Sequence, residues 1–146
     1  MTFGTRMSII RWPRDTVDPL AIPQEARDYL INEGLPEFVD NPRMEFGIYE
    51  SDRDLVIGQS GDCPVVLRIP DGEIVIENPT GHRMHVNRSV SHLGRFLGIW
   101  LDSASIVEAR SMLETLAPES VESGNSCFWG QVLDYESVID DSGQID

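Results

Sequence analysis

The segment VVLRIPDGEIVIE (residues 65–77) has the pattern of a β-hairpin. Val65, Leu67 and Ile69 alternate with Val66 and Arg68, which is the two-residue period of a strand with one buried face. Residues 70–72, Pro-Asp-Gly, form a turn signal, because glycine readily adopts the positive φ that hairpin closure needs. Residues 73–77, Glu-Ile-Val-Ile-Glu, are the predicted return strand. An antiparallel sheet is therefore the expected centre of the fold.

Further short strands are predicted on both sides of this hairpin, at residues 44–48, 55–58 and 84–86. In the first of them Met44, Phe46 and Ile48 alternate with polar or small neighbours, so these three side chains are expected to face the core. Turns rather than helices separate these strands, which predicts an antiparallel meander instead of βαβ units.

Helices are predicted before and after the strands. The first begins at Ile22-Pro23 and ends at Gly34-Leu35-Pro36, where glycine can adopt the left-handed conformation and proline blocks continuation. A second helix follows Asn87 or Ser89, either of which can cap it. A third begins at the capping-box residues 105–108 and stops at Pro118, and a last one covers residues 128–139.

These elements make up one domain. Residues 1–21 are expected to be irregular, residues 22–139 to form the domain, and residues 140–146 to be an acidic tail. The predicted fold class is α+β, with a mainly antiparallel sheet of about five to six strands, an N-terminal helix and two or three C-terminal helices.

The charge of the chain limits its partners. The 146 residues include 11 Lys+Arg, all of them arginine, and 25 Asp+Glu, for a formal net charge of −14. The 40% hydrophobic content is too high for a disordered polyanion. Nucleic acids and anionic membranes both call for a basic face, so neither is an expected direct partner.

The acidic residues are concentrated towards the C-terminus. Residues 101–146 contain ten of them and a single arginine, Arg110. This imbalance favours a basic partner through long-range attraction. The alternative interpretation is that the acidity only keeps the protein in solution.

The two cysteines and the short apolar stretches indicate a compartment. Cys63 and Cys127 are too few for a disulfide scaffold and are interpreted as reduced thiols, with a single bridge between them left open. Residues 7–10 are shorter than the ~7–15 apolar residues of a secretory signal. Residues 96–101 are shorter than the ~20 residues of a membrane helix. A cytoplasmic location is expected.

Motifs of common enzyme chemistry are incomplete in this sequence. His82, His85 and His92 have the spacing His-x2-His-x6-His, but they fall on a turn, a strand and a helix, without a pattern that fixes tetrahedral zinc geometry. Ser60 lacks the Gly-x-Ser-x-Gly context of a nucleophile elbow. The scattered turn glycines form no phosphate-binding loop. No catalytic residue, metal or cofactor is predicted.

Several short motifs occur in an order that is typical of one family. They are Tyr29-Leu30 with Gly34-Leu35-Pro36, Leu55-Val56-Ile57-Gly58, Val66-Leu67 with Asp71-Gly72-Glu73-Ile74, Val86-Asn87-Arg88-Ser89-Val90 with Phe96-Leu97, and Phe128-Trp129. On these motifs the sequence resembles the SUKH superfamily, and most closely its fourth immunity-protein subfamily. The likeness covers residues 22–139 and implies an α+β fold with helices flanking a mainly antiparallel sheet.

The resemblance also implies a function. It points to a non-enzymatic immunity protein that binds and neutralises a cognate polymorphic or contact-dependent bacterial toxin of the nuclease or deaminase type. Such toxins have basic substrate-binding surfaces, to which an acidic inhibitor is complementary. The residues predicted to form the acidic, partner-binding surface are Glu119, Glu122, Asp134, Glu136, Asp140 and Asp141.

Two other functions stay open on the sequence. A SUKH-like regulatory or adaptor module would bind a cellular protein instead of a toxin. A hydrolase or metal-dependent enzyme would be built around Cys63 and the histidines. The sequence determines neither the oligomeric state nor the identity of the toxin.

Overall fold

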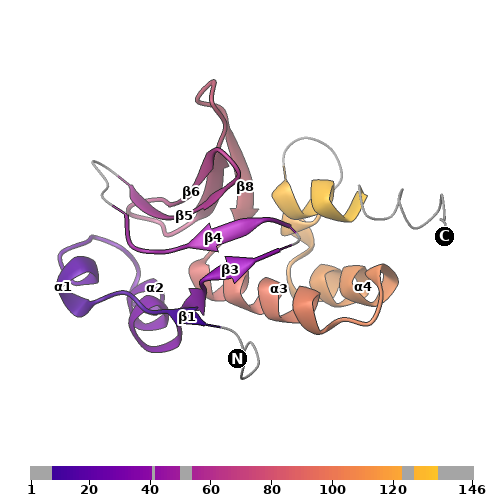
Figure 1. The fold of residues 1–146 in the computed structure, drawn as a ribbon, viewed down its shortest axis with the longest axis horizontal. Coiled ribbons are helices and arrows are strands. Elements are labelled where there is room, and N and C mark those ends of the chain that lie inside the picture. The colour runs from indigo at the N-terminus through magenta and orange to yellow at the C-terminus, as the bar shows by residue number, and fades with distance from the viewer. Residues whose placement is uncertain (1–7, 41, 50–53, 123–126, 135–146) are drawn as a thin grey trace.

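The protein has the α+β architecture that its sequence predicts (Figure 1). A computed structural model describes residues 8–40, 42–49, 54–122 and 127–134. Its centre is a six-stranded antiparallel sheet with the order β3-β4-β5-β6-β7-β8, so each strand pairs with its neighbour in sequence. The strands are β3 (Phe38–Val39), β4 (Met44–Phe46), β5 (Leu55–Ser60), β6 (Cys63–Leu67), β7 (Ile74–Glu77) and β8 (Arg83–Asn87). No helix in the described part of the chain is long and apolar enough to cross a bilayer.

The predicted central hairpin is confirmed. Strands β6 and β7 pair antiparallel, with Val65 opposite Ile76 and Leu67 opposite Ile74. Gly72 in the connecting turn has a φ of 82°, the left-handed value that favours glycine. The two strands are joined to the rest of the sheet on both sides, by β5 and by β8.

The side chains of β4 differ from the prediction at one position. Met44 and Phe46 are buried as expected, but the strand ends at Phe46 and Ile48 is 54% exposed. The expectation for Ile48 was therefore wrong. Alternation places a side chain on the core face only while the strand continues, and here the chain leaves the sheet two residues earlier.

Residues 8–21, the described part of the segment expected to be irregular, contain structure that the sequence pattern did not indicate. Strand β1 (Ile9–Ile10) pairs antiparallel with β2 (Leu35–Pro36), and α1 (Arg14–Val17) follows β1. Trp12 and Val17 belong to the hydrophobic core, with 1% and 0% of their surface exposed. The short, proline-interrupted segment is thus packed on the domain by two large side chains.

The N-terminal helix has the predicted end but not a uniform geometry. It consists of α2 (Gln24–Asp28), preceded by Pro23, and a π-helical turn η1 (Tyr29–Glu33). Gly34 terminates it with a φ of 79°, and its N–H donates to the carbonyl oxygen of Tyr29. Leu35 is then fully buried, as expected for the residue after such a glycine.

Helices α3 (Val90–Asp102) and α4 (Ile106–Leu116) follow the sheet, and both begin with a serine cap. The Ser89 Oγ accepts from the His92 N–H, and the Ser105 Oγ accepts from the Glu108 N–H. The sequence left Asn87 and Ser89 open as the cap of α3, and Ser89 is the cap. A 3-10 turn, η2 (Pro118–Ser120), follows α4, and the chain is helical again over residues 128–134.

The core lies between α3 and one face of the sheet. Leu93, Phe96 and Leu97 of α3 are completely buried and share one hydrophobic cluster with Val65 and Ile76 of the sheet. Helix α3 runs beneath the strands and α2 lies at one end of it (Figure 1). The other face of the sheet is covered only in part, which leaves surface for other contacts.

Candidate functional site

Three of the acidic residues predicted to bind a partner lie on two chain segments that pack against each other at one corner of the molecule. Glu119 lies in η2, Glu122 follows this turn, and Asp134 lies in the helix at residues 128–134. The other three predicted residues, Glu136, Asp140 and Asp141, lie outside the described residues. We call the η2 turn and residues 121–122 and 127–134 the C-terminal corner.

Two close contacts hold the halves of this corner together. The Cys127 thiol donates to the carbonyl oxygen of Glu119, at an Sγ···O distance of 3.3 Å. Gly130 packs directly on the carbonyl oxygen of Glu122, and a Cβ at position 130 would collide with that oxygen. Glycine is thus required at this crossing, although it is a weak helix former.

An aromatic cluster joins the corner to α3. Trp129 is fully buried, and its ring contacts Phe96, Trp100 and Phe128 at centroid distances of 5.6, 6.0 and 5.4 Å. Its indole N–H donates to the Asn87 Oδ1 at 3.0 Å, so the polar atom of this large side chain is satisfied inside the core. The corner therefore has a fixed position on the sheet.

A chain of polar contacts fixes the position of η2. The Ser120 hydroxyl lies 2.9 Å from the His85 Nε2, and the Glu73 carboxylate lies 2.7 Å from the His85 Nδ1. Arg68 donates to the other oxygen of Glu73 at 2.7 Å. These four residues, which we call the relay, connect strands β6 to β8 with the C-terminal corner. No motif in the sequence indicated the relay.

A carboxylate, an imidazole and a hydroxyl in this order also occur in serine hydrolases. There the hydroxyl must reach a substrate, whereas the Ser120 side chain is completely buried here. A fully buried hydroxyl with one strong partner stabilises a local conformation. We therefore assign the relay a positioning role for the η2 turn that carries Glu119.

The three described acidic residues of the corner differ in their environment. Glu119 and Glu122 are exposed side chains, and no ion pair to either appears among the described residues. Asp134 lies 3.4 Å from Arg110, which also approaches Glu114 at 3.9 Å. The Asp134 charge is thus partly compensated within the chain, and Glu119 and Glu122 contribute more to the local negative potential.

The histidines and cysteines do not form a metal centre in the described part of the chain. No group of three or more potential ligands comes together there. His82 is exposed in a turn, His85 belongs to the relay, and His92 lies on α3. Cys63 and Cys127 do not form a disulfide, which answers the question that their sequence left open.

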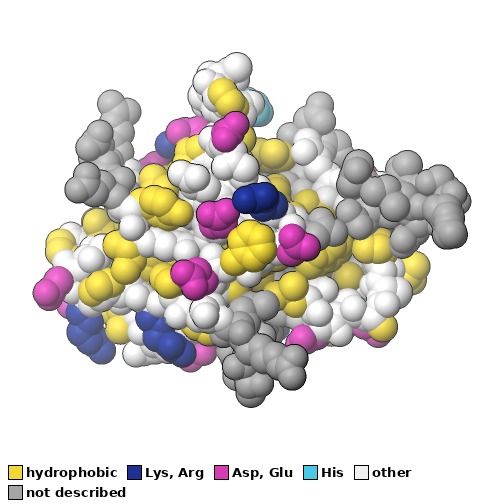
Figure 2. Space-filling view, in the orientation of Figure 1, with side chains coloured by type: hydrophobic (Ala, Val, Ile, Leu, Met, Phe, Trp, Pro, Cys, Tyr) yellow, Lys and Arg dark blue, Asp and Glu magenta, His cyan; other side chains and the backbone are white. Residues whose placement is uncertain are grey.

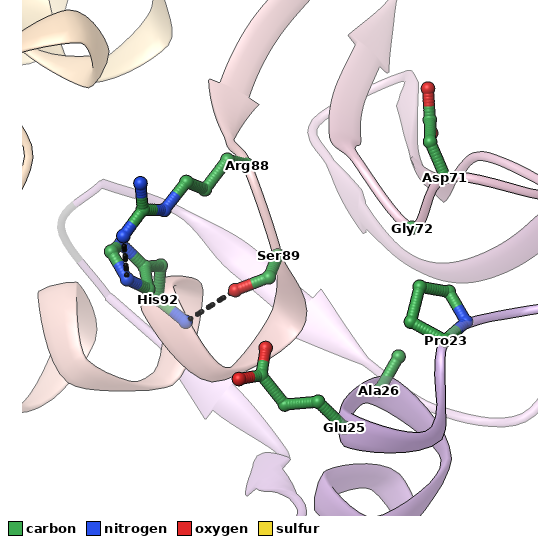
Figure 3. Close-up of a pocket in the computed structure, with 8 residues that line it drawn as sticks. All are labelled: Pro23, Glu25, Ala26, Asp71, Gly72, Arg88, Ser89 and His92. Carbon is green, nitrogen blue, oxygen red and sulfur yellow. Dashed lines mark hydrogen bonds between the residues drawn. The ribbon is translucent and has the colours of Figure 1, made fainter.

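A small pocket lies where α2, the β6–β7 turn and the start of α3 meet (Figure 3). Its volume is about 320 Å³. The residues that line it are Pro23, Glu25, Ala26, Asp71, Gly72, Arg88, Ser89 and His92. The lining includes two acidic residues and one arginine, so neither sign of charge is alone in it.

His92 in this pocket has a lowered pKa. Burial lowers its pKa below 6.5, and the charges of Arg88 and Arg95 lower it further, against the weaker opposite effect of Glu119 and Glu25. Arg88 approaches the His92 Nε2 at 3.0 Å. Because a guanidinium can only donate, the Nε2 accepts and the remaining proton is on Nδ1.

Comparison with known proteins adds no assignment. No family model, curated protein or solved structure matches this chain.

Proposed function

We propose that this chain is a non-enzymatic immunity protein that binds a cognate bacterial toxin with a basic surface and neutralises it. The observation that carries the proposal is the C-terminal corner, where Glu119 and Glu122 are exposed on a rigidly held turn. The resemblance to the fourth SUKH subfamily supports the same function and led us to the class of partner.

The physical basis is electrostatic attraction between unlike surfaces. The chain has a formal net charge of −14, and a nuclease or deaminase toxin must present positive charge to bind nucleic acid. Complementary charge raises the association rate by orders of magnitude over a neutral encounter. Rapid capture is what a protein needs when it has to reach a toxin before the toxin reaches its substrate.

The rigidity of the corner also supports binding. Ordering a flexible side chain or loop on association costs about 0.5–1.5 kcal/mol for each immobilised side chain. The buried relay and the Trp129 cluster fix the backbone at Glu119 and Glu122 before any partner arrives. The position of the negative charge of the corner is thus fixed before the toxin arrives.

Co-expression with the toxin candidate from the adjacent reading frame tests the proposal. We expect the chain to restore growth of cells that produce this toxin, and to elute with it as one complex. The Glu119→Arg/Glu122→Arg double variant should protect more weakly. The Asp15→Arg/Asp18→Arg variant is the matched control, because it makes the same charge change in α1 and at its C-cap, on the opposite side of the molecule (Figure 1).

Unchanged killing without a complex would contradict the proposed function. If the chain instead co-purifies with a cellular protein and leaves the toxin active, it is the regulatory or adaptor module that the sequence also allows.

A further inference from the structure

One half of the outer sheet face is open. Phe38, Glu45, Gln59 and Pro64 are aligned across β3, β4, β5 and β6. Directly opposed residues of neighbouring strands point to the same face, so these four side chains form one row. Its first three members are exposed, and the opposite face carries the buried side chains of the core. We call Phe38, Glu45, Gln59 and Pro64 the outer row.

Phe38 in this row is exposed to an unusual degree for an aromatic residue. Its side chain is 44% exposed, whereas Phe46 on the next strand is 3% exposed. Aromatic side chains at such positions are enriched among the residues that contribute most to protein–protein binding. Hydrophobic, acidic and basic side chains lie next to each other over β3 and β4 in the space-filling view (Figure 2).

The surroundings of the outer row are negative. Four exposed acidic residues occur here, namely Glu45 in the row, Glu37 and Asp40 beside Phe38 in sequence, and Asp62 in the β5–β6 turn. Arg43 is the one basic residue of these strands and turns within the described ranges 37–40, 42–47 and 55–67. The formal charge of this surface is −3.

Arg43 shows which group the outer row can hold. Its guanidinium carbon lies 5.9 Å from the centre of the Phe38 ring, and its Nη2 lies 3.4 Å from the Glu45 carboxylate. An aromatic face beside a carboxylate is a favourable environment for a guanidinium, through cation–π and ionic attraction. The Arg43 side chain is itself 68% exposed, so it occupies this position loosely.

We propose that the outer row is the docking surface for the toxin, and that an arginine of the toxin binds against Phe38 and Glu45 in place of Arg43. This inference rests on the proposed function and adds the contact that anchors the complex. The C-terminal corner supplies attraction at long range, but its large apolar side chains Trp129 and Leu133 are fully buried. The outer row has an accessible aromatic side chain and a carboxylate on neighbouring strands.

Calorimetric titration of the purified full-length chain with the same toxin domain tests the inference. Phe38→Ala and Glu45→Gln should each weaken binding about tenfold or more. Arg43→Ala should strengthen it several-fold, because it vacates the position and removes a like charge.

Two variants on α4 are matched controls. Met112 is 47% exposed, close to the 44% of Phe38, and Glu114 has the same 50% side-chain exposure as Glu45 and a similar arginine neighbour. Met112→Ala and Glu114→Gln should change the dissociation constant less than twofold. Circular dichroism of each variant checks that it is folded.

The outcomes separate the two proposals. If the wild-type chain neutralises the toxin while Phe38→Ala and Glu45→Gln bind equally well, the outer row is not the docking surface and the proposed function stands. If the wild-type chain does not bind the toxin, the proposed function is wrong. An NMR titration with a nine-residue arginine peptide then tests separately whether the outer row binds guanidinium groups. Shifts at residues 38, 45 and 59 would support a guanidinium-binding row, and shifts confined to residues 119–122 would overturn it.

Discussion

Ser120 has a polar side chain that is completely buried and depends on one partner. Its hydroxyl contacts the His85 Nε2 at 2.9 Å, and the imidazole is oriented by Glu73 on its other side. Replacing Ser120 with alanine leaves the imidazole nitrogen without this partner in a half-buried site. We expect Ser120→Ala to lower the free energy of unfolding by about 1–2 kcal/mol, measured by urea denaturation.

Ser111 on α4 is an exposed serine and provides the control for this substitution. Ser111→Ala should leave the unfolding free energy within about 0.5 kcal/mol of the wild-type value. A Ser120→Ala protein of full stability would contradict the positioning role. Covalent labelling of Ser120 by a serine-directed fluorophosphonate would contradict it as well, because a positioning hydroxyl is inaccessible to such a reagent.

His92 makes stability depend on pH. Because its pKa in the folded protein is lowered from 6.5, the unfolded chain takes up a proton at a higher pH than the folded chain does. The contribution of His92 to the free energy of unfolding is complete above pH 6.5, and it is lost as the pH falls through the lower pKa of the folded protein. We expect His92→Gln, which keeps an acceptor for Arg88, to reduce the loss of unfolding free energy between pH 7 and pH 5.

The exposed His82 is the control for the pH series, since His82→Gln changes the same residue type in a turn. Denaturant unfolding of the three proteins at several pH values gives the comparison. Identical pH profiles for wild type and His92→Gln would show that the buried imidazole does not resist protonation.

At the scale of the elements, the packing of α3 on the N-terminal helix depends on Gly94. A Cβ at this position would collide with the hydroxyl of Tyr29, a residue of η1. Alanine normally favours a helix over glycine by about 1 kcal/mol. Here we expect Gly94→Ala to destabilise the protein by about 2–3 kcal/mol, since forced overpacking outweighs the helix propensity.

A double-mutant cycle in urea denaturation checks this contact. The Tyr29 hydroxyl has no hydrogen-bond partner among the described residues, so Tyr29→Phe should cost little by itself. In that background Gly94→Ala should be less destabilising but still costly, because the nearest atom has been removed while the ring carbon Cζ of residue 29 would still collide with the new Cβ. Gly47→Ala, where a Cβ would meet only ordinary contacts from 3.6 Å, should be nearly neutral. Additive effects of the two substitutions would mean that the helices move apart instead.

Local signals explain which elements could be predicted. The cap at Ser105, the helix end at Gly34 and the turn at Gly72 each depend on a few adjacent residues and were predicted, and Ser89 was one of the two caps that the sequence allowed for α3. The burial of Trp12 depends on distant parts of the chain: its backbone N–H donates to the carbonyl oxygen of Leu30, eighteen residues further along. Such a contact leaves no periodic pattern in the sequence.

At the scale of the whole molecule, the net negative charge could be read from the sequence, but the arrangement of the charged and polar side chains on the fold could not. Glu119 and Glu122 lie on one of the two segments that meet at the C-terminal corner, and Asp134 lies on the other. The relay joins Glu73, His85 and Ser120, and only the sheet register and the path of the chain after α4 bring them together. The outer row likewise depends on the register of four strands, so neither arrangement has a sequence motif.

The uneven distribution of charge should control how fast a partner binds. If the proposed function holds, the association rate constant for the toxin should fall steeply with salt, by at least tenfold between 20 and 500 mM NaCl, measured by stopped flow. The dissociation rate should change little, because contacts at the outer row are short-range and less screened. Glu119→Arg/Glu122→Arg and Asp15→Arg/Asp18→Arg both reduce the formal charge from −14 to −10. A larger loss of association rate in the first variant would locate the attraction at the C-terminal corner, whereas equal losses would show that only the total charge matters.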